Sequence, residues 1–199
     1  MDGFLYDGRG RRKYLLPIER RAFLKAALEV GGQTASFCAV LVLCGPRISE
    51  ALALTPERID DATGTITFET LKRRRKGTMR AVPAPVELLL FLDNVHHYRE
   101  AQTNSSLAST RLWRWSRTTA WRRVKETMRL AKCPAFVSKP KSLRHAFGIA
   151  AVSRDVTLTM VKKWMGHARI QTTEIYTQLV GDEEQALAQR TWRELLPML

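Results

Sequence analysis

The chain contains few cysteines and no long apolar segment. Its three cysteines, Cys38, Cys44 and Cys133, form no CxxC or Cys–His pattern suited to zinc, so we expect buried small side chains in a reducing compartment. No run approaches the roughly 20 apolar residues that a membrane helix needs, and the first residues lack a signal-peptide pattern. We therefore predict a cytoplasmic protein that makes no membrane contact.

Signals for a nucleotide or a metal are absent as well. The sequence contains no P-loop and no acidic cluster, so we expect neither a cofactor nor a bound metal. Acidic residues are outnumbered, because 33 Lys and Arg stand against 19 Asp and Glu and give a formal net charge of +14. This excess predicts a polyanionic partner held through phosphate contacts. A merely basic soluble protein is the alternative that charge alone leaves open.

The basic residues gather in two stretches. Residues 72–76 form a run of five cations, and residues 111–132 hold eight cations against the single acidic residue Glu126. Clustering of this kind favours a surface that follows a phosphate backbone over a charge spread evenly for solubility. We expect both stretches to face the polyanion.

The hydrophobic pattern predicts a mainly α-helical chain with one small antiparallel sheet, an α+β fold. A hydrophobic content of 45% suits one compact domain. Residues 65–71 alternate polar and apolar side chains as a half-buried strand does, and residues 79–82 form the return strand. Apolar residues recur at three- and four-residue steps in the remaining segments. The predicted helices are residues 17–30, 34–44, 46–54, 86–98, 116–131, 142–153, 158–165, 170–179 and 183–195.

Three residues from separate segments suit attack on a phosphodiester. Arg47 and Arg144 lie in predicted helices, and Tyr176 comes nine positions after His167. A planar guanidinium can donate two parallel hydrogen bonds to phosphate oxygens, and the phenol is a candidate nucleophile. Ordinary structural roles are the alternatives: an ion pair of Arg47 with Glu50, a helix-capping imidazole at His167, and core packing or a surface hydrogen bond for Tyr176.

Four ordered segments resemble the tyrosine recombinase (phage integrase) family. They are residues 44–52 (CGPRISEAL), residues 80–83 (RAVP), residues 142–147 (SLRHAF), and residues 165–176, which begin MGHA and end at the tyrosine. The resemblance covers residues 17 to about 180. It implies the catalytic-domain fold of that family. It also implies cleavage and rejoining of DNA strands through a covalent 3′-phosphotyrosine, without a metal ion or ATP.

The resemblance assigns roles to the residues of the phosphate site. Arg47 and Arg144 would hold the scissile phosphate, Tyr176 would attack it, and His167 would support the transition state. Glu50 would orient an arginine, which agrees with the ion-pair alternative.

Two lysines complete the catalytic set that the resemblance implies. Lys72, in the β-hairpin, would protonate the departing 5′-oxygen, and Lys76 is the alternative because loop length decides which ammonium reaches the site. Lys141 stands where many family members have histidine. A lysine there can donate to a phosphate oxygen or help to manage the proton of the nucleophile.

Further cations are expected to contact double-stranded DNA. In the hairpin run these are Arg73, Arg74, Arg75 and Lys76, and in the second basic stretch they are Arg114, Arg117, Arg122 and Arg123. Ordinary phosphate contact is the expected role of the hairpin arginines.

The expected organisation has three parts. Residues 1–16 form a basic flexible arm or linker stub, residues 17–181 the catalytic domain, and residues 182–199 a C-terminal interaction helix. The last segment holds four acidic residues against two basic ones and several leucines, so it is poorly suited to DNA. We expect it to join protomers into a homo-oligomer, a tetramer on DNA, with packing against its own domain as the alternative.

The predicted function is site-specific DNA recombination. A nicking-closing enzyme similar to type IB topoisomerases is an alternative, because it uses the same chemistry without synapsis. A DNA-binding regulator that does not catalyse is the other. About 16 residues precede the first predicted helix, where family members usually have a further helical domain. The chain is therefore expected to be a minimal recombinase or an excised catalytic domain.

Overall fold

The computed structural model describes residues 5–70 and 77–177. The hairpin residues Lys72, Arg73, Arg74, Arg75 and Lys76 and the predicted C-terminal helix at residues 182–199 lie outside the described residues. The predictions made for these segments therefore remain predictions.

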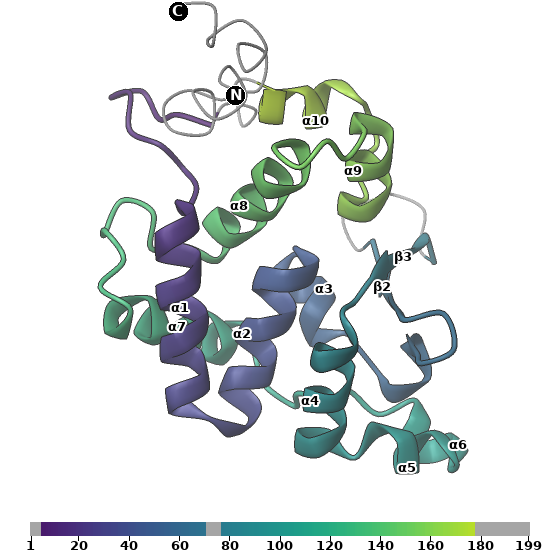
Figure 1. The fold of residues 1–199 in the computed structure, drawn as a ribbon. Helices are drawn as coiled ribbons and strands as arrows, with labels where there is room; N and C mark the ends of the chain where they lie inside the picture. The colour runs from purple at the N-terminus through teal and green to yellow at the C-terminus, as the bar shows by residue number, and fades with distance from the viewer. Residues whose placement is uncertain (1–4, 71–76, 178–199) are drawn as a thin grey trace, which may run out of the picture.

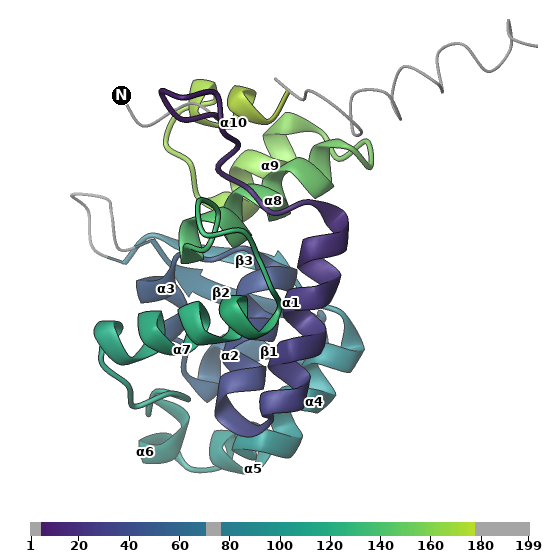
Figure 2. The ribbon, with the colours of Figure 1, turned by 90° about the vertical axis from the view of Figure 1, so that its left-hand side faces the viewer.

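The described residues fold mainly into helices around one small sheet (Figure 1), which confirms the predicted α+β class. Among them, α8, α9 and α10 lie at one end of the molecule and α5 and α6 at the opposite end in both ribbon views (Figures 1 and 2). The helices are α1 (Pro17–Val30), α2 (Gly32–Cys44), α3 (Ile48–Leu52), α4 (Val86–His96), α5 (Tyr98–Gln102), α6 (Ser105–Ala108), α7 (Arg117–Leu130), α8 (Pro140–Val152), α9 (Leu158–Met165) and α10 (Gln171–Glu174), with 3-10 turns η1 (Pro56–Arg58) and η2 (Ile175–Thr177).

The core is built around α2. This helix is apolar on nearly every side, and a helix of that kind is buried by its neighbours. It packs against α1, α4 and α8, and α7 lies across α1 and α2 (Figure 2). Cys38, Cys44 and Cys133 are buried thiols outside any disulfide, as the sequence predicts. None of the helices in the described ranges is long and apolar enough to cross a membrane.

The sheet has three antiparallel strands in the order β1-β2-β3, formed by Ile59–Asp60, Thr65–Glu69 and Met79–Pro83. The two longer strands were expected, and the short β1 joins them because Ile59 pairs with Ile66. Phe68 lies opposite Arg80, and Ile66 lies opposite Val82, so all four side chains are on the buried face. An arginine therefore occupies a core position of the sheet.

Several helix boundaries differ from the sequence-based prediction. The expected helix 46–54 is the shorter α3, which begins after Arg47, and α6 was not among the expected helices. The expected helix 86–98 ends at His96, because His97 adopts a left-handed conformation with φ 50° and a new helix begins at Tyr98. The expected helix 170–179 is a short α10 followed by the 3-10 turn η2. Tyr176 therefore lies in a tight 3-10 turn and not in the middle of a regular helix.

The N-terminal arm is folded where it is described, which differs from the expected flexible segment. Leu5 and Tyr14 are buried in the main core, and an isolated β-bridge pairs Tyr6 with Arg12. The Arg12 guanidinium donates to the Glu19 carboxylate of α1 at 2.8 Å. The glycine and arginine content suggested flexibility, but the apolar side chains within this segment pack against the domain.

Candidate active site

Arg47 is positioned by the sharp turn between α2 and α3. Gly45 ends α2 in the left-handed region at φ 64°, and a Cβ atom there would lie 2.5 Å from the ring of Phe147. Glycine is therefore required for both conformation and space. The turn places Arg47 at the start of α3 with its side chain 31% exposed, and its Nη1 donates to Glu50 Oε1 at 2.6 Å.

Arg144 lies beneath this turn and is buried. Its Nη1 donates to the carbonyl of Gly45 at 2.8 Å, and its Nη2 donates to the carbonyl of Met165 at the end of α9. One guanidinium thus joins α8 to the turn after α2 and to the C-terminal end of α9. Burial, and next the charge of Arg47, lowers the pKa of Arg144 to about 9, so the group stays charged at neutral pH.

Glu50 is the carboxylate at the centre of the site. It is 1% exposed, and its oxygens lie 2.6 Å from Arg47 Nη1, 2.6 Å from Arg80 Nη2 and 3.8 Å from Arg144 Nη1. Burial alone would raise the pKa of Glu50, but the three arginines together with the backbone amide of Arg47 lower it. One ionised carboxylate therefore faces three guanidinium groups. The excess positive charge of this cluster is suited to an anion.

His167 follows the Gly166 that ends α9 in the left-handed region. Its ring is buried, and Nδ1 lies 2.9 Å from the hydroxyl oxygen of Thr173. The imidazole thus contacts α10. A side chain that caps α9 would donate to a carbonyl of that helix, and within the described residues the His167 ring has no such hydrogen bond. Burial, and next the charges of Arg144 and Arg47, lowers the pKa of His167 to about 3, so the ring is neutral at neutral pH.

Tyr176 lies against His167 and is buried, with 1% of its surface exposed. The two rings are stacked with centroids 6.2 Å apart, and the tyrosine hydroxyl lies 3.3 Å from Nδ1 of His145. A Cβ atom at Gly148 would lie 2.7 Å from the tyrosine ring, so glycine is needed at that turn of α8. Burial raises the pKa of Tyr176 to about 12, although Arg144 and Arg47 act in the opposite direction. In this conformation the hydroxyl is shielded from solvent and keeps its proton.

The structure therefore brings Arg47, Arg144, His167 and Tyr176 into one cluster from four separate segments. Lys141 lies on the first turn of α8, one turn before Arg144, and its side chain is exposed. The strands β2 and β3 that flank the hairpin run pack beside α3 and α9, respectively (Figure 1).

Two residues of this cluster are missing from the sequence-based set. Arg80 is bound to Glu50, and His145 contacts the Tyr176 hydroxyl. Arg80 alternates in phase with the apolar Val82, so strand periodicity could have identified a buried arginine. For His145 no local signal exists, because its contact with Tyr176 depends on how η2 packs against α8.

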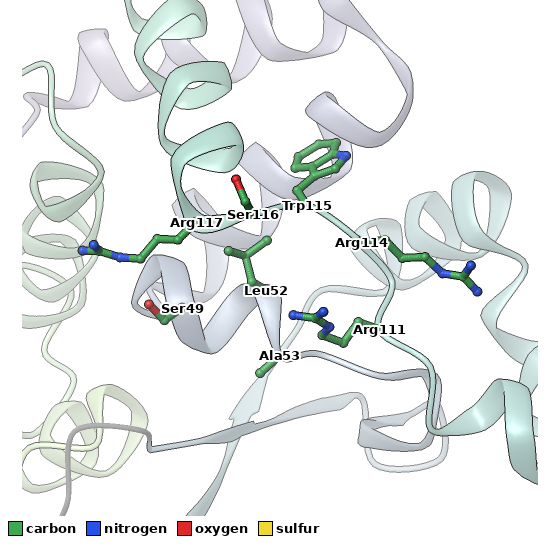
Figure 3. A pocket seen from close by; sticks show the side chains of 8 residues that line it. All are labelled: Ser49, Leu52, Ala53, Arg111, Arg114, Trp115, Ser116 and Arg117. Atoms are coloured by element: carbon green, nitrogen blue, oxygen red, sulfur yellow. The ribbon is translucent and has the colours of Figure 1, made fainter.

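The second basic stretch lies next to α3. Arg111, Arg114 and Arg117 line an open pocket of about 430 Å³ together with Ser49, Leu52, Ala53, Trp115 and Ser116. Figure 3 shows Arg114 and Arg117 pointing outward on opposite sides of Leu52, with Arg111 between them. Ser49 belongs to the helix that carries Arg47 at its N-terminus. The pocket therefore lies beside α3, the helix that begins directly after Arg47.

The expected DNA-contacting residues of α7 differ in their surroundings. Arg117 and Arg122 are exposed and, within the described ranges, lie in no ion pair. Arg123 donates to the Thr34 hydroxyl at 2.9 Å and lies 4.6 Å from the centre of the Trp115 ring. Its side chain thus helps to pack α7 against α2. Across the described residues no group of three or more His, Cys, Asp or Glu side chains is placed to hold a metal ion.

Acid should destabilise the fold through His167 and His96, whose packing disfavours the charged imidazole. His167 has a pKa of about 3 when folded and an ordinary value of 6.5, and burial also lowers the pKa of His96 to about 4. The unfolded chain takes up these protons below pH 6.5 and the folded chain does not, so stability is complete above pH 6.5 and is lost as the pH falls. Each histidine should cost up to about 2 kcal/mol between pH 6.5 and 5.

Urea unfolding at pH 7.5, 6 and 5 measures this effect. His167→Asn should reduce the loss of stability on acidification. His97→Asn, a change at an exposed histidine, is the matched control and should leave the pH dependence as it is in the parent. An identical pH dependence in His167→Asn and the parent would contradict the assignment of a neutral, buried imidazole.

Solved structures share this fold. The crystal structure of XerA recombinase superposes with a TM-score of 0.74 at 20% identity, over 89% of this chain and 64% of that one. XerH recombinase, in a pre-cleavage complex with its difH substrate, superposes with a TM-score of 0.69 at 18% identity, over 92% of this chain and 59% of that one. The described domain thus has the fold of a tyrosine recombinase catalytic domain.

The sequence comparison names the family. The model of the phage integrase family matches residues 13–182, so the chain belongs to that family. Tyrosine recombinase XerD from Pseudomonas aeruginosa is 31% identical over 160 residues, which are 76% of this chain and 51% of that protein. The chain spans about half the length of the curated relatives that it matches.

Proposed function

We propose that this chain carries the catalytic domain of a site-specific DNA recombinase that works through a 3′-phosphotyrosine intermediate. The observation that carries the proposal is the buried cluster in which three arginines surround one carboxylate beside a histidine and a tyrosine. Such a cluster has an excess of positive charge that suits a phosphodiester and the further negative charge that develops on it during attack. Membership of the phage integrase family supports the same reaction.

The two motif arginines have different parts in this proposal. Arg47 is partly exposed and has one nitrogen on Glu50, so the rest of its fork can donate to a non-bridging oxygen of the phosphate. Arg144 is held by two backbone carbonyls, and its buried charge stabilises the negative charge that develops as phosphorus gains a fifth oxygen. His167 supplies a neutral donor. In the proposed tautomer, Nδ1 accepts a hydrogen bond from the Thr173 hydroxyl, 2.9 Å away, and Nε2 carries the hydrogen that would reach a phosphate oxygen.

Tyr176 is the proposed nucleophile. Its oxygen forms a bond to phosphorus while the bond to the 5′-oxygen breaks, and the 3′-phosphate remains on the tyrosine. The leaving oxygen takes a proton from Lys72, or from Lys76 in the alternative, and Lys141 assists with the phosphate or with the proton of the tyrosine. Because the hydroxyl is shielded in this conformation, DNA binding must move η2 before attack.

In the proposed mechanism the rejoining step needs no nucleotide. The free 5′-hydroxyl of another strand attacks the phosphotyrosine, so the energy of the original bond is conserved in the covalent intermediate. The arginines, lysines and histidine provide the charge stabilisation for which other phosphoryl-transfer enzymes use metal ions. We therefore expect activity without a divalent metal or ATP.

The proposed DNA surface includes the pocket beside α3 and the exposed side of α7. Arg114, Arg117 and Arg122 would contact the phosphate backbone, with a smaller contribution from Arg123 because it also packs against α2. The hairpin residues 73–76 would add contacts near the cleavage point. We propose that the segment 182–199 joins protomers into a tetramer on double-stranded DNA. A cytoplasmic location is part of the same proposal.

A covalent-capture experiment tests the proposed reaction. Nicked duplexes with a randomised site are incubated with the protein, the mixture is denatured, and DNA that remains attached to protein is isolated and sequenced. Attached DNA that converges on one sequence supports a site-specific enzyme. DNA binding without an adduct would favour the regulator. An adduct with relaxation of supercoiled plasmid but no strand exchange between two sites would favour the nicking-closing enzyme.

DNA affinity should depend on salt through Arg117. We expect Arg117→Ala to lower the slope of log affinity against log salt by about 0.9, the value for one phosphate contact. Fluorescence anisotropy on a captured site at several salt concentrations measures the slope. Arg99→Ala is the matched control. Arg99 lies on α5, at the end of the molecule opposite α8, α9 and α10, and it forms ion pairs with Asp61 and Asp93. Equal slopes in the two variants would reject the DNA-facing assignment of Arg117.

A further inference from the structure

Arg80 is a buried arginine on β3, an edge strand of the sheet. It is 7% exposed, it pairs with Phe68 across β2 and β3, and its guanidinium lies 5.5 Å from the centre of that ring. A charged side chain at a core position is costly unless its donors are satisfied. The contacts that satisfy its donors therefore indicate the role of Arg80.

All three guanidinium nitrogens of Arg80 donate to protein groups. Nη2 donates to Glu50 Oε2 at 2.6 Å, Nη1 to the Thr70 hydroxyl at 3.1 Å, and Nε to the carbonyl of Trp164 at 2.7 Å. These partners belong to α3, to the residue after β2, and to α9. Because it is buried and its nitrogens already donate to protein, Arg80 is not placed to hold a phosphate itself.

The contact with Glu50 controls the other two arginines. Oε2 accepts from Arg80 and from the backbone amide of Arg47, and Oε1 accepts from Arg47 Nη1. Arg144 Nη1 is 3.8 Å from the same Oε2, so it is the next guanidinium that could bind that oxygen. Without Arg80, only the Arg47 amide would hold Oε2, and the carboxylate could turn toward Arg144 and loosen its contact with Arg47 Nη1. Both guanidinium groups would then change orientation.

The contact with Trp164 holds the turn that carries His167. Trp164 is near the end of α9, and Gly166 follows it in the left-handed region. A Cβ atom at Gly166 would lie 3.0 Å from Cδ of Arg80 and 3.0 Å from the Thr70 hydroxyl oxygen. The glycine before His167 therefore packs directly on the Arg80 side chain. The strand next to the hairpin and the histidine turn are joined at this point.

We propose that Arg80 is a positioning residue for strand cleavage. It holds Glu50 so that Arg47 presents its free donors to the phosphate, and it holds the His167 turn against β3. The inference rests on the proposed recombinase function and adds to it a residue that touches neither DNA nor the nucleophile.

Single-turnover cleavage of a captured nicked site tests this role. We expect Arg80→Met to slow adduct formation at saturating protein by about 100-fold, the scale for small displacements of catalytic groups, while the Kd for DNA changes by less than about threefold. Arg80→Lys keeps the charge and supports folding, but one ammonium cannot reach three separated partners, so it should stay slow. Arg58→Met is the matched control. It removes a half-buried ion pair with Glu69 at the same sheet and should cleave at the parent rate.

The outcomes separate this inference from the proposed function. Adduct formation by the parent with cleavage at the parent rate by folded Arg80→Met would overturn the positioning role alone. Full activity of Arg80→Lys would do the same, because it would show that a buried charge suffices. If Arg80→Met does not fold, the cleavage rate of Arg80→Lys tests the positioning role in its place. No adduct with the parent protein would overturn the proposed function, and this inference with it.

Discussion

Tyr176→Phe should abolish the covalent adduct with DNA. The substitution removes only the hydroxyl oxygen that would attack phosphorus, and the described site offers no second phenol beside His167. The ring can still stack on His167 and pack against Gly148, so the fold should be kept. Only the 3.3 Å contact with His145 is lost, and DNA affinity should stay near that of the parent. Denaturing gels with end-labelled nicked DNA detect the adduct, and anisotropy measures the affinity.

Tyr98→Phe provides the matched control for this experiment. Tyr98 is also buried, and its hydroxyl donates to Asp61 at 2.8 Å on the far side of the domain. Losing that hydrogen bond should reduce stability by about 1 kcal/mol and leave adduct formation intact. An adduct of normal yield with Tyr176→Phe would refute Tyr176 as the nucleophile, and peptide mapping of that adduct would identify the true one.

Arg144→Lys should slow cleavage by about 100- to 1000-fold, equivalent to about 3 to 4 kcal/mol of transition-state stabilisation. A lysine cannot donate to the carbonyls of Gly45 and Met165 together, so the turn that positions Arg47 would lose one of its supports. The substitution also favours loss of the positive charge at position 144. Burial lowers the pKa of Arg144 from 12.5 to about 9. The same burial acts on a lysine, whose ordinary pKa of about 10.4 is lower at the outset, and favours its neutral form.

Rates of adduct formation at pH 7 and pH 9 measure how far Arg144→Lys slows cleavage. Arg154→Lys is the matched control, because Arg154 follows α8 at its other end, is exposed and donates to the carbonyl of Ala150. It should cleave at the parent rate. If Arg144→Lys also cleaves at the parent rate, Arg144 cannot be the buried charge that stabilises the transition state.

Local patterns in the sequence were sufficient for most of the secondary structure. The apolar α2, the amphipathic α7 and the strand pair β2–β3 were predictable because helix and strand periods depend on residues only a few positions apart. Gly45 and Gly166 could be placed at helix ends for the same reason. The boundaries at His97 and η2 were missed, since backbone conformations there depend on packing.

The motif residues could be chosen from the sequence, but their surroundings could not. Residue type indicated Arg47, Arg144 and Tyr176 as one chemical set, and the resemblance to the family added His167. They did not indicate that Tyr176 is buried with its hydroxyl on His145, or that Arg123 helps to pack α7 on α2. These contacts join segments that are distant in the chain, and no local period reveals which side chains will lie opposite one another.

Residue types and their order thus defined the family, the helical class and the chemistry that the chain can offer to a phosphate. The packing of α3, α8, α9 and the sheet defined how that chemistry is arranged. One buried carboxylate came to serve three arginines because Glu50, Arg80 and Arg144 converge from three elements. Charge balance among buried groups depends on distances in space, and those distances arise only when the chain has folded.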